Sequence, residues 1–359
     1  MNKHSLILTI SLVVLLAVSA AAGTPNVRYK DIRALGMGGA GIATMNDFSA
    51  VMYNPAQLVR AETHIDLINI QANVGKDITD MFSFYDDHKD TFDDWDGATE
   101  SEQDALLKDM TPFDDNWMGV GAYPQIGISF PNFALGVYGA SDVRFKADKS
   151  VFADPRAYVD GVADLVFTAG AAMELPVSFV PHKLYGGAAI KIIRRQQIEN
   201  FKFSADNVEL GTVYDSLSEE TLTGFGLDVG LLYELMPDID LGMKITDVIG
   251  SIDGDAPPRM INVGAAWHMT PELTFAADFN DMLFTRGENI FNKLYFGAEF
   301  TGIPILPLRA GFGQGYPSIG AGLKLGILDL DGAVYGVEFS DHPGGDGDYN
   351  YAVRLKIGF

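Results

Sequence analysis

The chain has 359 residues, with 48 acidic and 25 basic side chains, 39 glycines, no cysteine and a formal net charge of −23. Because phosphate groups bind to basic surfaces, this charge argues against a nucleic-acid partner. The absence of cysteine excludes disulfide bonds, thiolate metal ligands and cysteine catalysis. The apolar fraction of 47% is too high for a disordered chain, so we expect a folded body.

Residues 1–22 have the features of a secretory signal peptide. A short polar start with Lys3 precedes an apolar stretch over residues 6–18, and alanines at 20–22 supply the small side chains of a cleavage site. The stretch is too short to span a bilayer as a helix, which argues against a transmembrane anchor. We therefore expect cleavage after Ala22 and export, and we expect any later membrane insertion to use strands.

Residues 23–60 form the second predicted segment, which is rich in glycine. Gly36, Gly38 and Gly41 fit the G-x-G-x-x-G spacing of dinucleotide-binding loops, which requires a buried strand before it and a helix after it. Residues 29–33 read Tyr-Lys-Asp-Ile-Arg, and only strand-like patterns follow. We therefore interpret the glycines as a tight turn in which backbone packs closely against its surroundings.

Residues 61–359 alternate between apolar side chains and small or charged ones. Within residues 222–235, the apolar residues Phe225, Leu227 and Val229 alternate with Gly226 and Asp228. Alternate residues of a strand face opposite sides, so each set has one parity, odd or even, and one face. Similar runs recur to the C-terminus and predict about fourteen strands of the length that crosses a bilayer at a tilt. Because lipid cannot satisfy a free sheet edge, the sheet must close. We predict a transmembrane antiparallel β-barrel over 61–359, with residues 23–60 as a plug in its lumen.

A soluble β-sandwich is the alternative fold. The length of the strands, together with glycines and charges of both signs on the second face, favours the membrane. Short turns, as at 236–238, alternate with longer loops, as at 75–117, which is typical of outer-membrane barrels. We expect residues 100–110 to form a short helix over the mouth. Aromatic residues near strand ends are typical of an interfacial girdle; they are Trp117, Tyr123, Phe130, Phe133, Trp267 and Tyr349.

An acidic stretch at 86–97 invites comparison with calcium-binding loops. Asp94, Asp96 and Gly97 fit part of an EF-hand loop, but Phe92 and Gln103 occupy the first and last ligand positions. We interpret the stretch as a solvated acidic outer loop. The sequence contains no H-E-x-x-H or G-x-S-x-G motif, so we predict no metal site, no cofactor and no catalytic residue.

Two groups of residues in the second segment form a recognisable pattern: the glycines Gly36, Gly38, Gly39 and Gly41, and the turn Asn54, Pro55 and Ala56. This pattern resembles the N-terminal plug of the FadL-type transporters of hydrophobic compounds and of their PorV-type relatives. Residues 186–191 and 224–231 also resemble the PorV branch. The resemblance implies a fourteen-stranded barrel whose plug carries the Asn-Pro-Ala turn.

Basic residues on the lumen parity of the predicted strands form a candidate site for an anionic head group. The candidates are Arg309, Lys324, Arg354 and Lys356. A carboxylate would form charge-assisted hydrogen bonds with such side chains. The alternative is that these cations pair with lumen carboxylates such as Asp240 and Glu299.

Three functions follow from the sequence, all in the outer membrane. The FadL resemblance implies uptake of a hydrophobic, fatty-acid-like small molecule, which binds in the plugged lumen and leaves sideways through the wall. The PorV resemblance implies a component that assists the secretion or surface attachment of exported proteins. The third interpretation is a structural or adhesive protein. The expected partners are membrane lipids and lipopolysaccharide, a hydrophobic ligand, and secretion machinery or an exported protein.

Overall fold

The computed structural model describes residues 29–114, 116–148, 156–177, 181–204, 221–285 and 288–359. The predicted signal peptide lies outside these residues. The helices are α2 (Ile32–Gly36), α3 (Ala50–Tyr53), η2 (Pro55–Arg60), α4 (Ile78–Asp93), α5 (Glu100–Asp109), η3 (Thr111–Phe113) and η5 (Ile290–Lys293). The strands are β1 (His64–Gly75), β2 (Met118–Ala122), β3 (Gln125–Phe130), β4 (Phe133–Asp148), β5 (Arg156–Glu174), β6 (Leu184–Ser204), β7 (Thr221–Met236), β8 (Ile239–Ile252), β9 (Met260–Thr270), β10 (Leu273–Phe279), β11 (Leu294–Phe300), β12 (Leu308–Gly313), β13 (Tyr316–Leu325), β14 (Leu328–Glu338) and β15 (Gly347–Gly358).

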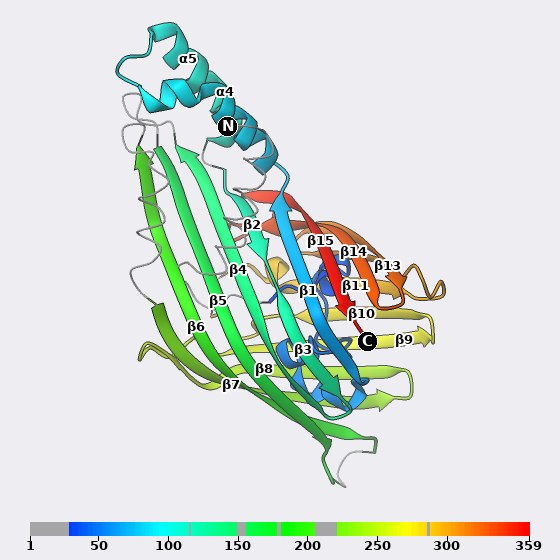
Figure 1. Cartoon of the computed structure of the whole chain (residues 1–359). Coiled ribbons are helices and arrows are strands. Elements are labelled where there is room, and N and C mark those ends of the chain that lie inside the picture. The colour runs from blue at the N-terminus through cyan, green and yellow to red at the C-terminus, as the bar shows by residue number, and fades with distance from the viewer. Residues whose placement is uncertain (1–28, 115, 149–155, 178–180, 205–220, 286–287) are drawn as a thin grey trace.

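All the described strands belong to one antiparallel sheet, in which successive strands lie side by side (Figure 1). β15 also pairs with β1, from Asp66 opposite Gly358 to Gly75 opposite Asn350, so the sheet closes into a barrel. β2 and β3 follow one another between β1 and β4 and share a single position in the wall. The described wall therefore has fourteen strand positions, which confirms the predicted transmembrane antiparallel β-barrel.

The alternation of apolar and polar residues along each strand gives the wall an apolar outer face and a polar inner face. On β7, Phe225 is 52% exposed on the outer face, whereas Asp228 is only 1% exposed on the inner face. Ile190, Ile192 and Ile249 on the neighbouring strands β6 and β8 are also exposed on the outside. An apolar exterior around a polar interior is what a hydrocarbon surrounding requires.

The predicted aromatic girdle is confirmed at some positions and wrong at another. Phe130, Phe133 and Trp267 are exposed on the outer face, and Trp267 stacks on Phe275 of β10 with ring centroids 5.6 Å apart. Tyr123 is fully buried instead. It falls on the inward parity of its stretch, where its hydroxyl donates a hydrogen bond to a lumen carboxylate.

Helices α4 and α5 form a hairpin that projects beyond the ends of the strands (Figure 1). Ile78 and Phe84 of α4 pack with Val74 of β1 and Val120 of β2, which lie on the outward parity, so the hairpin stands on the outer face of the wall. The helix expected over residues 100–110 is confirmed as α5, which packs on α4 in the projecting hairpin and not over the mouth. Residues 86–93, expected in a loop, continue α4. No helix in the described ranges is long and apolar enough to span a bilayer.

Candidate functional site

Residues 29–60 lie inside the barrel as a compact segment (Figure 1). α2 packs on β12, β13 and β14, whereas η2 packs on β5, β6 and β7 across the lumen. Asp31 begins α2 by accepting the backbone N–H of Arg33 at 2.8 Å. Asn54 begins η2 by accepting the N–H of Ala56 at 3.1 Å, and Pro55 takes the first helical position, where its missing N–H would have no partner.

The Asn-Pro-Ala turn also connects the plug to itself and to the wall. The side-chain amide of Asn54 donates to the carbonyl of Ile42 at 3.1 Å and to the carbonyl of Leu231 on β7 at 3.0 Å. Asn54 is completely buried, so each of these bonds replaces one that water would have made. This turn is therefore a fixed contact between the plug and the barrel.

Glycines on the inner face let the plug backbone touch the wall. These contact glycines are Gly297, Gly311 and Gly313 beside Met37 and Gly38, Gly242 and Gly264 beside Ile42, Gly127 and Gly136 beside Phe48, and Gly187 and Gly230 beside residues 54–56. A Cβ atom added to Gly297 would lie 2.5 Å from Cβ of Met37, and one added to Gly136 would lie 2.6 Å from the ring of Phe48. Side chains at these positions would push the plug away from the wall.

The plug glycines make the same contacts from the other side. Gly38 has φ +68°, and a Cβ there would lie 2.5 Å from the backbone nitrogen of Phe312. Gly39 faces the ring of Tyr295, Gly41 faces the ring of Tyr53, and Gly36 lies against Gly320. No strand precedes this stretch among the described residues of the plug, so the G-x-G-x-x-G spacing serves close packing and not a βαβ unit.

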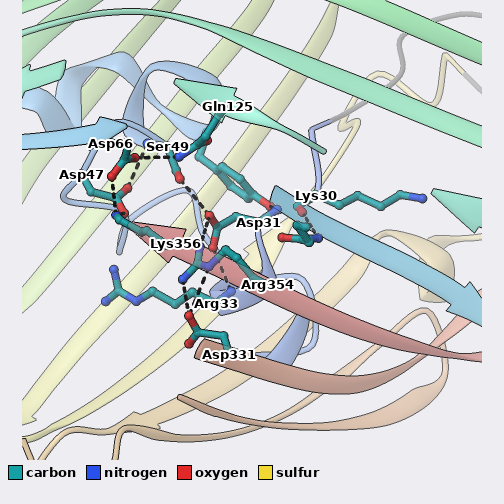
Figure 2. Close-up of polar contacts among 12 residues, drawn as sticks. Lys30, Asp31, Arg33, Asp47, Ser49, Asp66, Gln125, Asp331, Arg354 and Lys356 are labelled. Carbon is teal, nitrogen blue, oxygen red and sulfur yellow. Dashed lines mark hydrogen bonds and ion pairs between the residues drawn. The ribbon is translucent and has the colours of Figure 1, made fainter. Parts of the chain in front are cut away.

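A chain of buried ion pairs joins the plug to the wall beneath α2. Figure 2 shows Arg354 between Asp31 of the plug and Asp331 of β14, with nitrogen–oxygen distances of 3.0 and 2.8 Å. Arg33 of the plug binds Glu299 at 2.6 Å. Arg309 closes the chain by contacting both Glu299, at 2.9 Å, and Asp331, at 2.8 Å. The charges alternate, so each buried carboxylate has a cationic partner.

Further contacts fix the plug at other points of the wall. Lys356 binds Asp66 of β1 at 2.9 Å and lies 4.0 Å from Asp47 (Figure 2). Arg60, at the end of η2, forms an ion pair with Asp240 of β8. Asp278 of β10 accepts the backbone N–H groups of Gly41 and Ile42 at 2.7 and 2.9 Å.

The sequence-predicted anion site is not a cluster that faces open space. Arg309, Arg354 and Lys356 form the ion pairs described above, and Lys324 is exposed near the end of β13, opposite Asp329 in the strand register. None of the four lines the cavity that the described residues enclose.

That cavity has a volume of about 940 Å³ and lies between the plug and the mouth of the barrel. The plug contributes Leu35, Ile42 and Met52 to its lining, together with the ring of Tyr29. Tyr29 meets Tyr138 of β4 edge to face, with ring centroids 5.5 Å apart. The cavity therefore combines an apolar floor on the plug with aromatic rings and charged side chains of the wall.

Sequence reasoning missed these aromatic lining residues. The alternation along the strands could have identified two of them, because Tyr138 and Tyr335 fall on the lumen side of their predicted strands. In the acidic stretch, Asp94 accepts the N–H of Gly97 at 3.1 Å within the α4–α5 connection. The described residues contain no group of three histidine or carboxylate side chains arranged for a metal.

A closed wall with an apolar exterior around a packed N-terminal plug is the fold of the FadL-type barrels, and the predicted resemblance is confirmed for the fold. The Ralstonia pickettii toluene transporter TbuX has a TM-score of 0.53 and 13% identity, over 93% of this chain and 99% of that chain. The P. putida toluene transporter TodX has a TM-score of 0.53 and 11% identity over the same shares. No curated protein sequence matches the chain.

A family model described as the F plasmid transfer operon TraF protein matches residues 51–290. The match starts within α3 of the plug and ends just before β11, so it covers more than half of the chain. The chain therefore belongs to this TraF family.

Proposed function

We propose that this protein transports hydrophobic small molecules across the outer membrane, and that the cavity above the plug is the binding site. The observation that carries this proposal is the cavity of about 940 Å³, whose floor is formed by the plug. Its size suits a small organic ligand. The two transporters of similar fold are both named for toluene, which supports an apolar ligand. We also propose that export depends on cleavage of the predicted signal peptide after Ala22.

We infer that the ligand leaves sideways, as the FadL resemblance implies, beside residues 123 and 124. The wall strand is interrupted here, because β2 ends at Ala122 and β3 begins at Gln125. Pro124 has no N–H to donate, so this point of the wall can form fewer hydrogen bonds than its neighbours. Tyr123 fills the inner side of the break, where its ring contacts Tyr29 and its hydroxyl bonds to Asp142 at 2.5 Å.

Ligand binding tests the first part of the proposal. The full chain in neutral lipid nanodiscs should bind labelled toluene and octanol saturably. Val162 lines the cavity, so Val162→Trp should weaken binding by about tenfold by filling space. Phe167 lies on the outer face of the same strand, and Phe167→Trp should leave affinity unchanged. Absence of saturable binding in the parent protein would refute the transport proposal.

A disulfide tests the exit route, because the chain has no cysteine of its own. Ala72 of β1 and Ala122 of β2 face each other across the seam beside the break. In Ala72→Cys with Ala122→Cys, the oxidised protein should still bind octanol but deliver it to the surrounding lipid more slowly. Reduction of the same sample should restore the rate. An equal rate in both redox states would place the exit elsewhere.

A second candidate function is the PorV-like one, assistance to the secretion or surface attachment of exported proteins. The observation that favours it is the α4–α5 hairpin, which stands on the outer wall and projects away from the barrel. A hairpin that only closed the lumen would not need this outside anchor. Capture of an exported protein by the full chain, lost in a variant whose residues 78–110 are replaced by a short Gly-Ser linker, would support this function over a purely transporting one.

A further inference from the structure

The cavity lining contains more acidic than basic side chains. Seven carboxyl groups and four basic side chains contribute to the lining, a surplus of three acidic side chains among the described residues. Charges in a confined space with low-dielectric walls act on a ligand more strongly than charges on an open surface. The surplus therefore bears on which ligands the cavity accepts.

Each basic side chain in the lining is already paired with a carboxylate. Lys30 binds Asp142 at 2.7 Å, and Arg144 lies 3.4 Å from Asp160. Lys191 and Lys244 both contact Asp228 at 2.8 Å, and Lys191 also contacts Asp247 at 2.7 Å. An anionic ligand would have to compete with these carboxylates for every cation of the lining.

The three surplus acidic side chains are Asp278 of β10, Glu288 of the β10–β11 connection and Glu338 at the end of β14. Asp278 accepts two backbone N–H groups of the plug through Oδ2, its Oδ1 has no hydrogen-bond partner, and no basic side chain of the described residues pairs with it. Glu288 shares Lys293 with Asp281, so that trio keeps one negative charge. Glu338 is held by neutral donors, among them the hydroxyl of Tyr316 at 2.9 Å.

Tyrosine rings are a further part of the cavity lining. Tyr29, Tyr138 and Tyr335 line the cavity, and the hydroxyl of the buried Tyr29 has no hydrogen-bond partner among the residues that the structure describes. The faces of such rings attract cations, and Lys30 already lies 5.8 Å from the ring centroid of Tyr123 beside the cavity. Aromatic rings and carboxylates in one cavity are a favourable combination for an ammonium group.

We propose that the cavity selects cationic amphiphiles: molecules with an apolar body and an amine or quaternary ammonium group. The apolar body would lie against Leu35, Ile42 and Met52 of the plug, and the cationic group would lie between the tyrosine rings and the side of Asp278 and Glu288. This inference rests on the proposed transport function, and it narrows the ligand to a class opposite in charge to a fatty-acid anion.

Three probes with the same alkyl chain separate the two proposals. The full chain in neutral nanodiscs is titrated with octyltrimethylammonium, octanoate and octanol, with protein-free nanodiscs as the reference for lipid partitioning. We expect octyltrimethylammonium to bind about tenfold more tightly than octanoate, with octanol between them. Added salt should reduce the difference.

Isosteric variants assign the effect to the cavity. Asp278→Asn with Glu288→Gln should reduce the ratio of the two affinities to about threefold. Asp104→Asn removes an exposed carboxylate of α5 outside the cavity and should leave the ratio unchanged. Saturable octanol binding with octanoate equal to or tighter than octyltrimethylammonium would overturn the cationic preference alone. Failure of all three probes to bind would instead refute transport of hydrophobic molecules.

Discussion

Single glycines of the inner wall decide how closely the plug approaches the barrel. A side chain at Gly187 of β6 would overlap the backbone of Pro55 and Ala56. We therefore expect Gly187→Val to displace the Asn-Pro-Ala turn, to lower the free energy of unfolding by roughly 1–3 kcal/mol, and to increase ion conductance past the plug. Planar-bilayer recordings of the full chain measure the conductance, and urea titration measures the stability.

A second wall glycine provides the matched control. Gly332 of β14 has no atom closer than 4.0 Å to the position of an added Cβ, so a side chain there has room. Because valine suits a strand better than glycine, Gly332→Val should keep or slightly raise stability and leave conductance low. Equal conductance in the two variants would show that the contact glycines do not hold the plug.

The ion pairs beneath α2 make a second residue-scale prediction. Arg354 is buried between Asp31 and Asp331, and its removal leaves the buried Asp31 without its cationic partner, whereas Asp331 keeps Arg309. Arg354→Met should therefore lower the free energy of unfolding by about 3–5 kcal/mol. Lys324→Met, at an exposed position of the neighbouring strand β13, should change it by less than about 0.5 kcal/mol. Urea titration of both variants in lipid measures this difference.

The alternation along each strand predicted which side chains point into the lumen, but it could not predict the residues with which they form ion pairs. Arg309 and Arg354 were assigned to the lumen because they alternate with apolar residues. The partner of Arg354, Asp31, lies 323 positions away in a segment with no strand pattern. Only the three-dimensional position of the plug brings these two charges together, so a predicted anion site and a structural ion pair could not be distinguished from the sequence.

At the scale of elements, the N-terminus of α5 is stabilised by a capping box whose contribution depends on pH. Thr99 accepts the N–H of Glu102 at 3.4 Å, and the carboxylate of Glu102 accepts the N–H and hydroxyl of Thr99 at 2.8 and 2.7 Å. The hydrogen bonds from the backbone and side chain of Thr99 lower the pKa of Glu102. This capping box therefore stabilises the helix fully above the ordinary glutamate pKa of about 4.3, and the stabilisation is lost as pH falls through the lower folded value.

An NMR titration of the Glu102 carboxyl in the full chain measures this effect. Thr99→Ala removes the hydroxyl, so the pKa of Glu102 should rise toward its ordinary value, and α5 should fray at neutral pH. Asp104 lies on the same helix outside the capping box, and Asp104→Asn should leave the Glu102 titration unchanged. An unaltered Glu102 titration in Thr99→Ala would contradict the capping role.

The strands and the helix α5 were predictable as elements, whereas α4 and the position of the hairpin were not. A strand between lipid and lumen must alternate strictly, and that alternation is visible in a single sequence. The segment at 78–110 mixes acidic and apolar residues without a strand pattern, and apolar residues such as Ile78 and Phe84 gain a partner only when the barrel places Val74 and Val120 beside them. The position of the hairpin on the outer wall depends on contacts between distant segments, which a local sequence pattern cannot predict.

For the whole molecule, closure of the wall and the outward apolar band place the protein in the bilayer, and three tryptophans can report that position. Trp267 faces outward near the turn between β9 and β10, where its indole N–H donates to Asp238 at 3.0 Å. Trp95 is buried in the hairpin, and Trp117 lies against Arg144 at the mouth. An amphipathic ring at the lipid–water boundary is the usual position for tryptophan in a membrane barrel.

Only Trp267 should therefore lie within reach of lipid chains. In vesicles of brominated lipid, we expect Trp267→Phe to abolish most of the quenching of tryptophan fluorescence that the parent protein shows. Trp95→Phe should keep that quenching, because it removes a residue of the projecting hairpin. If quenching persisted in Trp267→Phe and disappeared in Trp95→Phe, the hairpin would have to lie in the bilayer, and the placement of the membrane around the apolar faces of β9 and β10 would be wrong.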